Sequence, residues 1–140
     1  MTTELKHPVD KAPLFLNSLK EKKVSLNLET RRCGEITVVY CEGRLVFRDE
    51  ALALSELVVD LLRQNQDVVL DLTKVDAIDS AGLGELVSLH MMAKANGSAI
   101  HLCGVNSRMH ELLELTNVSS LFEIFPTDDT ALGMNFSRAQ

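Results

Sequence analysis

The sequence predicts one α/β domain: a mixed, mostly parallel sheet with helices packed against it, in the order ββαβαβαβα. After an opening hairpin, segments typical of strands and of helices alternate along the chain. Such alternation indicates parallel strands, because each parallel pair needs a crossover connection that is usually a helix. The 140 residues, 46% of them hydrophobic and 24% charged, suffice for one self-supporting core.

Residues 1–22 are predicted to form a loosely ordered N-terminal extension, and residues 23–140 the domain itself. Pro8 and Pro13 interrupt any long helix in this extension. Most of its other residues are polar, apart from the short apolar patch Leu14–Leu16. We therefore expect no more than one helical turn there.

The domain is predicted to open with a β-hairpin. Val24, Leu26 and Leu28 alternate with polar residues, which is typical of a half-buried strand. Residues 31–34 predict a turn. The β-branched and aromatic run over residues 36–41 then predicts a second strand, antiparallel to the first.

A helix and a central strand are expected next. Asp49 is predicted to be the N-cap of a helix that runs to about Arg63. Its apolar residues recur at helical spacing and define the buried face: Leu54, Leu57, Val58, Leu61 and Leu62. The nearly continuous apolar run over residues 67–72 predicts a strand covered on both faces.

The second half continues the alternation. A helix from Ser80 to about Ala95 is predicted, ended by Asn96 and Gly97. The remaining predicted elements are a strand over residues 99–103, a helix over 107–115, a strand over 121–125 and a helix from Asp128 to about Phe136. Four residues of the helix over 107–115 are expected to face inward: Met109, Leu112, Leu113 and Leu115.

Composition excludes several functions. A formal net charge of −6 argues against binding to nucleic acid or an anionic membrane surface. The three cysteines form no CxxC pair, and the acidic residues lack the spacing of metal ligands, so no metal or other cofactor is expected. No apolar stretch approaches the roughly 20 residues of a membrane span, and the N-terminus does not resemble a signal peptide. We expect a cytoplasmic protein that does not insert into membranes.

Asp79 and Ser80, at the predicted start of a helix, are the most informative residues. Asp and Ser are both good N-caps, so the pair is open to a purely structural interpretation. Alternatively, Ser80 accepts a phosphate, whose charge the positive end of a helix dipole stabilises. The small residues Ala81 and Gly82 that follow leave the serine sterically accessible.

Ser80 is not expected to be a hydrolytic nucleophile. It lies outside any Gly-x-Ser-x-Gly elbow, and His90 is ten residues further along the same helix, about 15 Å away. Gly82 and Gly84 lack the lysine or third glycine of a phosphate-binding loop. The pattern favours close packing of the helix start on the sheet, and a binding protein over an enzyme.

The helix after Ser80 has two possible apolar surfaces. Four of its residues are expected to pack on the sheet: Leu83, Leu86, Val87 and Met91. Leu89 and Met92 then point elsewhere, beside Glu85 and Ser88. This second set is either the margin of a broad core stripe or an outer patch for a protein partner.

The run from Leu70 to Gly84, which ends in Asp-Ser-Ala-Gly-Leu-Gly, resembles the signature of bacterial anti-sigma-factor antagonists of the STAS family. The segments Glu111–Val118, Leu121–Phe122 and Ala131–Leu132 are similar to the later part of that domain. The resemblance covers about Val24 to Leu132 and implies a single STAS-like domain.

The resemblance implies a partner switch. Ser80 corresponds to the family's phosphoacceptor and Asp79 to its acidic neighbour. The unphosphorylated protein binds an anti-sigma factor that is also a serine kinase, which frees a sigma factor. That kinase phosphorylates the serine and ends binding, and a PP2C-type phosphatase restores it. The predicted partner-binding residues are Asp79, Ser80, Ala81, Gly82, Leu83, Glu85, Ser88, Leu89 and Met92.

One position departs from the family pattern. Members often carry Gly-Glu-Leu-Asp at the end of the second strand, where this chain has Gly43-Arg-Leu-Val46. Asp49 is the candidate to replace the missing acid. The alternative function is a scaffold, or a subunit of a regulatory or lipid-transport complex, in which the serine is not a switch.

Overall fold

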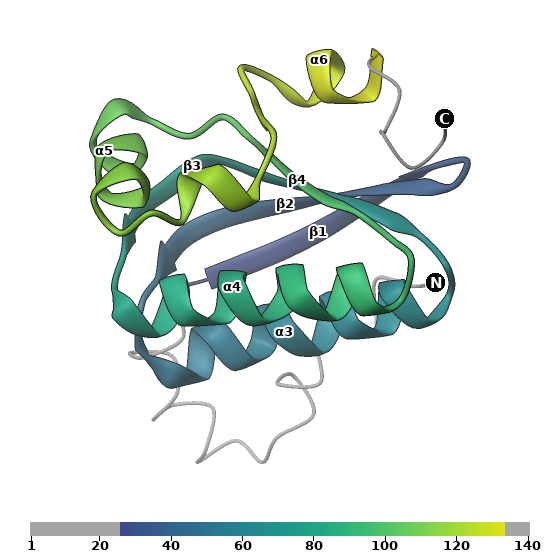
Figure 1. The fold of residues 1–140 in the computed structure, drawn as a ribbon, viewed down its shortest axis with the longest axis horizontal. Helices are drawn as coiled ribbons and strands as arrows, with labels where there is room; N and C mark the ends of the chain where they lie inside the picture. The colour runs from purple at the N-terminus through teal and green to yellow at the C-terminus, as the bar shows by residue number, and fades with distance from the viewer. Residues whose placement is uncertain (1–25, 134–140) are drawn as a thin grey trace.

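The computed structural model describes residues 26–133. The predicted extension over residues 1–22, its helical turn and the end of the last predicted helix near Phe136 therefore lie outside the described residues. The elements follow one another as β1 (Leu26–Cys33), β2 (Ile36–Leu45), α3 (Phe47–Arg63), β3 (Asp67–Ile78), α4 (Ser80–Ala95), β4 (Ile100–Cys103), α5 (Ser107–Leu115), the 3-10 turn η2 (Ser119–Leu121), β5 (Ile124–Phe125) and α6 (Asp128–Gly133) (Figure 1). The predicted order of strands and α-helices is confirmed.

The sheet has five strands in the order β1-β2-β3-β4-β5. β1 and β2 are antiparallel, whereas every later pair is parallel, as predicted. The hairpin turn lies at residues 34–35 rather than 31–34, because β1 extends to Cys33, which pairs with Ile36. Gly34 takes the turn position with φ 66°, a conformation that glycine adopts without strain.

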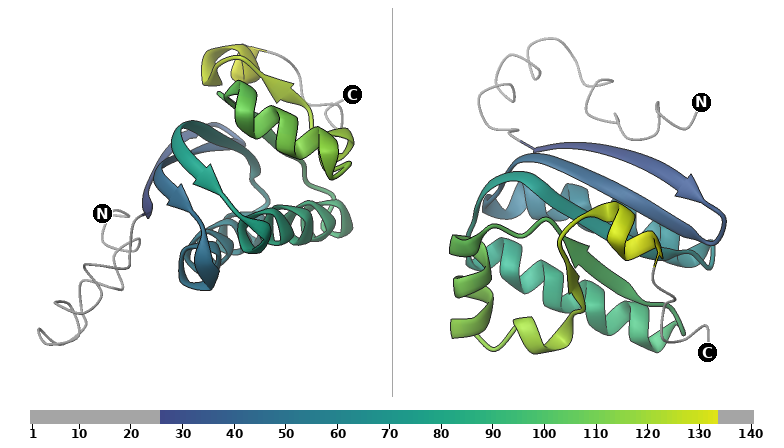
Figure 2. Two further views of the ribbon diagram at one scale, coloured as in Figure 1. Left: turned by 90° about the vertical axis from the view of Figure 1, so that its left-hand side faces the viewer. Right: turned by 90° about the horizontal axis from the view of Figure 1, so that it is seen from above.

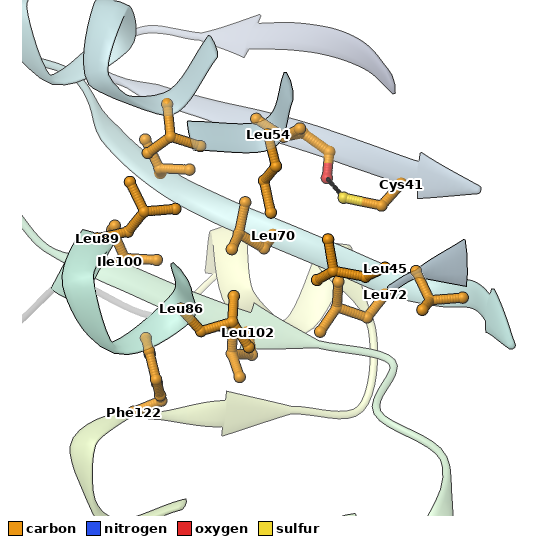
Figure 3. Packing of buried hydrophobic residues seen from close by; sticks show 14 of the residues in the cluster. Cys41, Leu45, Leu54, Leu70, Leu72, Leu86, Leu89, Ile100, Leu102 and Phe122 are labelled. Atoms are coloured by element: carbon orange, nitrogen blue, oxygen red, sulfur yellow. Dashed lines mark hydrogen bonds between the residues drawn. The ribbon is translucent and has the colours of Figure 1, made fainter. Parts of the chain in front are cut away.

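Helices cover the two faces of the sheet unequally. α3 and α4 lie side by side along one face, and α6 lies on the other (Figures 1 and 2). The main core fills the space between the sheet and the helix pair, where Leu86 and Leu89 of α4 point toward Leu70 and Leu102 (Figure 3). A smaller cluster under α6 contains Ala131. Within residues 26–133, every helix is too short or too polar to span a lipid bilayer.

The start of α3 corrects one prediction. Val46, not Asp49, is the N-cap residue, and it makes no side-chain capping bond. The helix starts early because β2 stays paired with β3 as far as Leu45 and because the Val46 side chain is buried. Asp49 instead lies exposed in the first turn of α3, where its negative charge interacts favourably with the positive end of the helix dipole.

The C-terminal region differs from expectation in two places. Leu115 is 76% exposed, so its predicted inward orientation is wrong, whereas Met109 and Leu113 are buried. The predicted strand over residues 121–125 is reduced to Ile124–Phe125, because the 3-10 turn η2 occupies Ser119–Leu121. The apolar character of this segment is explained by Phe122, whose side chain is buried against the core.

Candidate functional site

The candidate site lies where β2 and β3 end side by side. Leu45 pairs with Ile78 at the last position of both strands. The backbone N–H of Asp79 donates to the Leu45 carbonyl oxygen at 3.4 Å, and α4 begins at the next residue. Since α3 begins directly after β2, the starts of α3 and α4 lie together at the C-terminal ends of these two strands (Figure 1).

Asp79 caps α4, which leaves Ser80 free of that task. Oδ1 of Asp79 accepts the backbone N–H of Gly82 at 3.0 Å, and the Asp79 backbone is extended, as at an N-cap. Ser80 is the first helical residue and its side chain is exposed. The N–H groups of Ser80 and Ala81 belong to the first turn, so they have no acceptor within the helix. The serine thus lies in solvent beside positively polarised backbone groups.

Gly82 explains how close the helix start approaches the sheet. A Cβ atom at Gly82 would collide with the Leu45 carbonyl oxygen and lie 2.8 Å from Cγ1 of Ile78. The expectation of close packing is therefore confirmed for Gly82. It is wrong for Gly84, where a Cβ would meet nothing within 4 Å.

The outer side of α4 differs from the prediction at two residues. Leu89 is fully buried, so it does not point away from the sheet, whereas Leu83 and Leu86 are buried as predicted. Met91, predicted to pack on the sheet, is 62% exposed. The inward stripe consists of Leu83, Leu86, Leu89 and Ala93, because α4 lies between α3 and Phe122 rather than flat against the sheet alone.

The exposed side of α4 forms a strip that begins at the serine. Its members are Ser80, Ala81, Gly84, Glu85, Ser88, Met91 and Met92, each exposed or half-buried. Most of the predicted partner-binding residues lie on this strip, but Gly82, Leu83 and Leu89 lie beneath it. Met91 was missed because helical spacing alone did not reveal on which side α3 covers the helix.

A groove beside the C-terminal end of β3 was also not predicted from the sequence. The second half of β3 pairs with β2 alone, so its other side faces α5. A cavity of about 390 Å³ opens there between Ala77 and Ile78 of β3 and Met109, Leu112 and Leu115 of α5. The only sequence signal was the apolar residue Leu115, which was assigned to the core.

The other candidate chemistry is weak in the described part of the chain. His90 stacks edge-on against Phe122, with ring centroids 5.4 Å apart, rather than hydrogen-bonding to Ser80. No group of three His, Cys, Asp or Glu residues in residues 26–133 is arranged to hold a metal ion. Burial raises the pKa of the Cys41 thiol to about 12, so that thiol is not activated.

The family follows from comparison with known proteins. The model of the STAS domain matches residues 27–131, three quarters of the chain, from the second residue of β1 into α6. This chain belongs to the STAS domain family. Its geometry agrees, since the Asp-Ser pair starts the helix that follows the central strand.

Known proteins similar to this one include antagonists of anti-sigma factors. An anti-sigma F factor antagonist of Paenibacillus polymyxa is 34% identical over 67 residues, which cover 48% of this chain and 55% of that protein. An anti-sigma-B factor antagonist of Bacillus subtilis is 31% identical over 74 residues, 53% of this chain and 68% of that protein. The match thus spans little more than half of the Paenibacillus relative.

The fold is also found in solved structures. A putative anti-sigma factor antagonist from Thermotoga maritima superposes with a TM-score of 0.69 over 75% of this chain and 91% of its own. The two sequences are 23% identical, so this likeness concerns the STAS fold alone.

Proposed function

We propose that this STAS domain is an anti-sigma-factor antagonist controlled by phosphorylation of Ser80. Unphosphorylated, it binds an anti-sigma factor with serine kinase activity and so frees a sigma factor in the cytoplasm. The kinase then phosphorylates Ser80 and releases the complex, and a PP2C-type phosphatase resets the protein. The domain acts as a binding module and contributes no catalytic group of its own.

The observation that carries this proposal is the division of labour between Asp79 and Ser80. Because Asp79 makes the capping bond to Gly82, the Ser80 hydroxyl has no role in starting α4. An exposed hydroxyl without a structural role, followed by Ala81 and Gly82, is accessible to a kinase. The names of the curated relatives supply the class of partner.

The proposed switch is electrostatic and steric. A phosphate on Ser80 adds a charge of about −1.5 to −2. In the free protein, the N–H groups at the start of α4 stabilise this charge. In a complex, the same charge lies under the partner, next to Asp79 and close in sequence to Asp76, where desolvation and like-charge repulsion oppose binding.

Val46 stands where many family members carry an acidic residue. We propose that this difference affects which kinase phosphorylates the protein. The Val46 side chain is buried at the start of α3, so an apolar residue replaces the acid that is common in the family. Asp49 is exposed in the first turn of α3 and is the nearest acidic residue along that helix. We propose that Asp49 supplies the negative charge that the partner meets beside Ser80.

The test measures binding to an anti-sigma factor kinase from the same cells. Ser80→Ala is expected to keep binding and lose release by ATP, whereas Ser80→Asp weakens binding at least tenfold. Ser107→Asp is the matched control, because Ser107 is the exposed first residue of α5 behind an Asn106 cap. Equal weakening by both aspartates would reject a specific role for Ser80, and phosphosite mapping that finds no phosphate on Ser80 would favour the non-switching scaffold.

A further inference from the structure

The last part of β3 is an edge of the sheet. β2 pairs with β3 as far as Ile78, whereas β4 pairs with it only as far as Asp71. β4 ends at Cys103, and Gly104 then lies so close to Thr73 that a Cβ atom on Gly104 would collide with it. Among the described strands, residues 74–78 therefore have a neighbour on one side only.

The main chain of this edge has unused hydrogen-bonding capacity. In a strand, the N–H and C=O groups of successive residues point alternately toward the two sides. Apart from the ladder with β2, the main chain of residues 74–78 makes no backbone hydrogen bond to another residue of the described part. The groups that point away from β2 are thus available to pair with another extended chain.

The groove between β3 and α5 runs along this edge. Asp76, Ala77 and Ile78 all line its cavity of about 390 Å³. Because successive side chains of a strand point to opposite faces, a cavity lined by three residues in a row follows the edge of the strand. The opposite wall extends from Arg108 to Leu115, about 10 Å of helix, which is the length of about three residues of extended chain.

The walls of the groove indicate what kind of chain fits. Leu112 and Leu115 line it from α5, and the Leu115 side chain is 76% exposed. Asp76 on one wall and Glu111 on the other are exposed acidic residues, while Arg108 is the cation of the lining. An extended segment with apolar side chains and a neighbouring basic residue complements this lining.

The groove is continuous with the phosphorylation site of the proposed function. Ile78, which lines the groove, is followed directly by Asp79 and Ser80. The Cα atoms of Ile78 and Ser80 are therefore at most about 7 Å apart. α5 also lies at the same end of the sheet as the start of α4 (Figures 1 and 2). A protein that covers Ser80 can thus extend into the groove without crossing another element.

We infer that an extended segment of the anti-sigma factor pairs with the open edge of β3 and places its apolar side chains against Leu115. This inference rests on the proposed function, because the occupant belongs to the partner that meets Ser80. Main-chain pairing supplies part of the affinity, and the apolar wall selects the segment. The groove holds the partner beside the serine, so a phosphate there acts on a contact that is already in place.

The first test measures the affinity of the full chain for the anti-sigma factor kinase from the same cells. Leu115→Glu should weaken binding about tenfold or more, because it places a charge in the apolar groove. Leu115→Met keeps an apolar side chain and should bind within about twofold of the wild type. Leu121→Glu is the matched control, since Leu121 is an exposed leucine that lines a different cavity, and it should also bind within about twofold.

The second test measures hydrogen exchange in the complex. Amides of residues 74–78 that exchange quickly in the free protein should be slowed at least tenfold by the partner, because pairing with a strand protects them. β1 (Leu26–Cys33), another edge strand of the described sheet, is the internal control and should not change. Protection of β1 in place of residues 74–78 would overturn the inference.

The binding results separate this inference from the switch at Ser80. If Leu115→Glu binds as tightly as the wild type while Ser80→Asp binds weakly, the switch stands and the groove is not the docking site. An equal loss of binding in Leu115→Glu and Leu121→Glu would also overturn the inference. Absence of binding by the wild-type chain would refute the proposed function, and the inference with it.

Discussion

The starts of α4 and α5 are built alike and placed differently. In α4, Asp79 accepts the N–H of the third helical residue, Gly82, at 3.0 Å. In α5, Asn106 accepts the N–H of the third helical residue, Met109, at 2.8 Å. Both helices then have an exposed serine at their first position.

The difference lies in the residues that follow each serine. Gly82 allows α4 to approach the Leu45 carbonyl, and leaves the serine beside small residues. At α5, Arg108 is exposed and Met109 inserts its side chain into the core. A cap and a serine therefore do not identify a regulatory site on their own. The surroundings that make the serine approachable distinguish α4 from α5.

The largest expected effect concerns the third helical position of α5. Met109→Ala should lower the free energy of unfolding by about 2–5 kcal/mol, because it removes a buried side chain and leaves a cavity. Urea denaturation measures this loss. Leu115→Ala, on the exposed side of the same helix, should change stability by less than about 0.5 kcal/mol. Equal losses would mean that α5 packs by Leu115 and that the comparison of the two starts is wrong.

The third position of α4 should respond to added volume instead. Gly82→Ala is expected to cost about 1–3 kcal/mol, because its methyl group collides with the rigid backbone at Leu45. Gly84→Ala, two residues on, has open space and should stabilise the helix by about 0.5–1 kcal/mol. Thermal unfolding of the two variants tests this. If Gly82→Ala were neutral, the close approach of α4 to β2 would not exist.

The smallest effect concerns the caps themselves. Asp79→Ala and Asn106→Ala should each cost about 0.5–2 kcal/mol, since each frees one backbone N–H of a first turn. Asp79→Asn keeps a cap and should restore most of the stability at α4. Chemical denaturation of the three variants shows whether the two caps are equivalent. A loss for Asp79→Asn as large as for Asp79→Ala would assign Asp79 a role beyond the hydrogen bond.

Features set by neighbouring residues were predictable from the sequence. The bounds of α4 were correct, because Asp79, Asn96 and Gly97 are local signals that do not depend on the rest of the fold. The predicted bounds of α5 were correct as well. The antiparallel first pair and the parallel later pairs followed from the hairpin and from the alternation of strands and helices. The placement of Asp79 and Ser80 at one helix start was predictable for the same reason.

Features set by distant residues were not predictable. Whether Leu89 or Met91 faces the core depends on how α4 lies between α3 and Phe122, which are far from it in sequence. Val46 is the N-cap residue of α3 because β2 pairs with β3 as far as Leu45. The groove beside α5 combines residues from β3 and α5, so no single stretch of sequence predicts it.

The order of the strands has a consequence for how the chain is made. Every strand of the sheet lies next to the strand that precedes it in the sequence. As the polypeptide leaves the ribosome, each new strand finds its pairing edge already synthesised, and none has to wait for a later segment. The sheet can thus grow in the direction of translation, one crossover at a time.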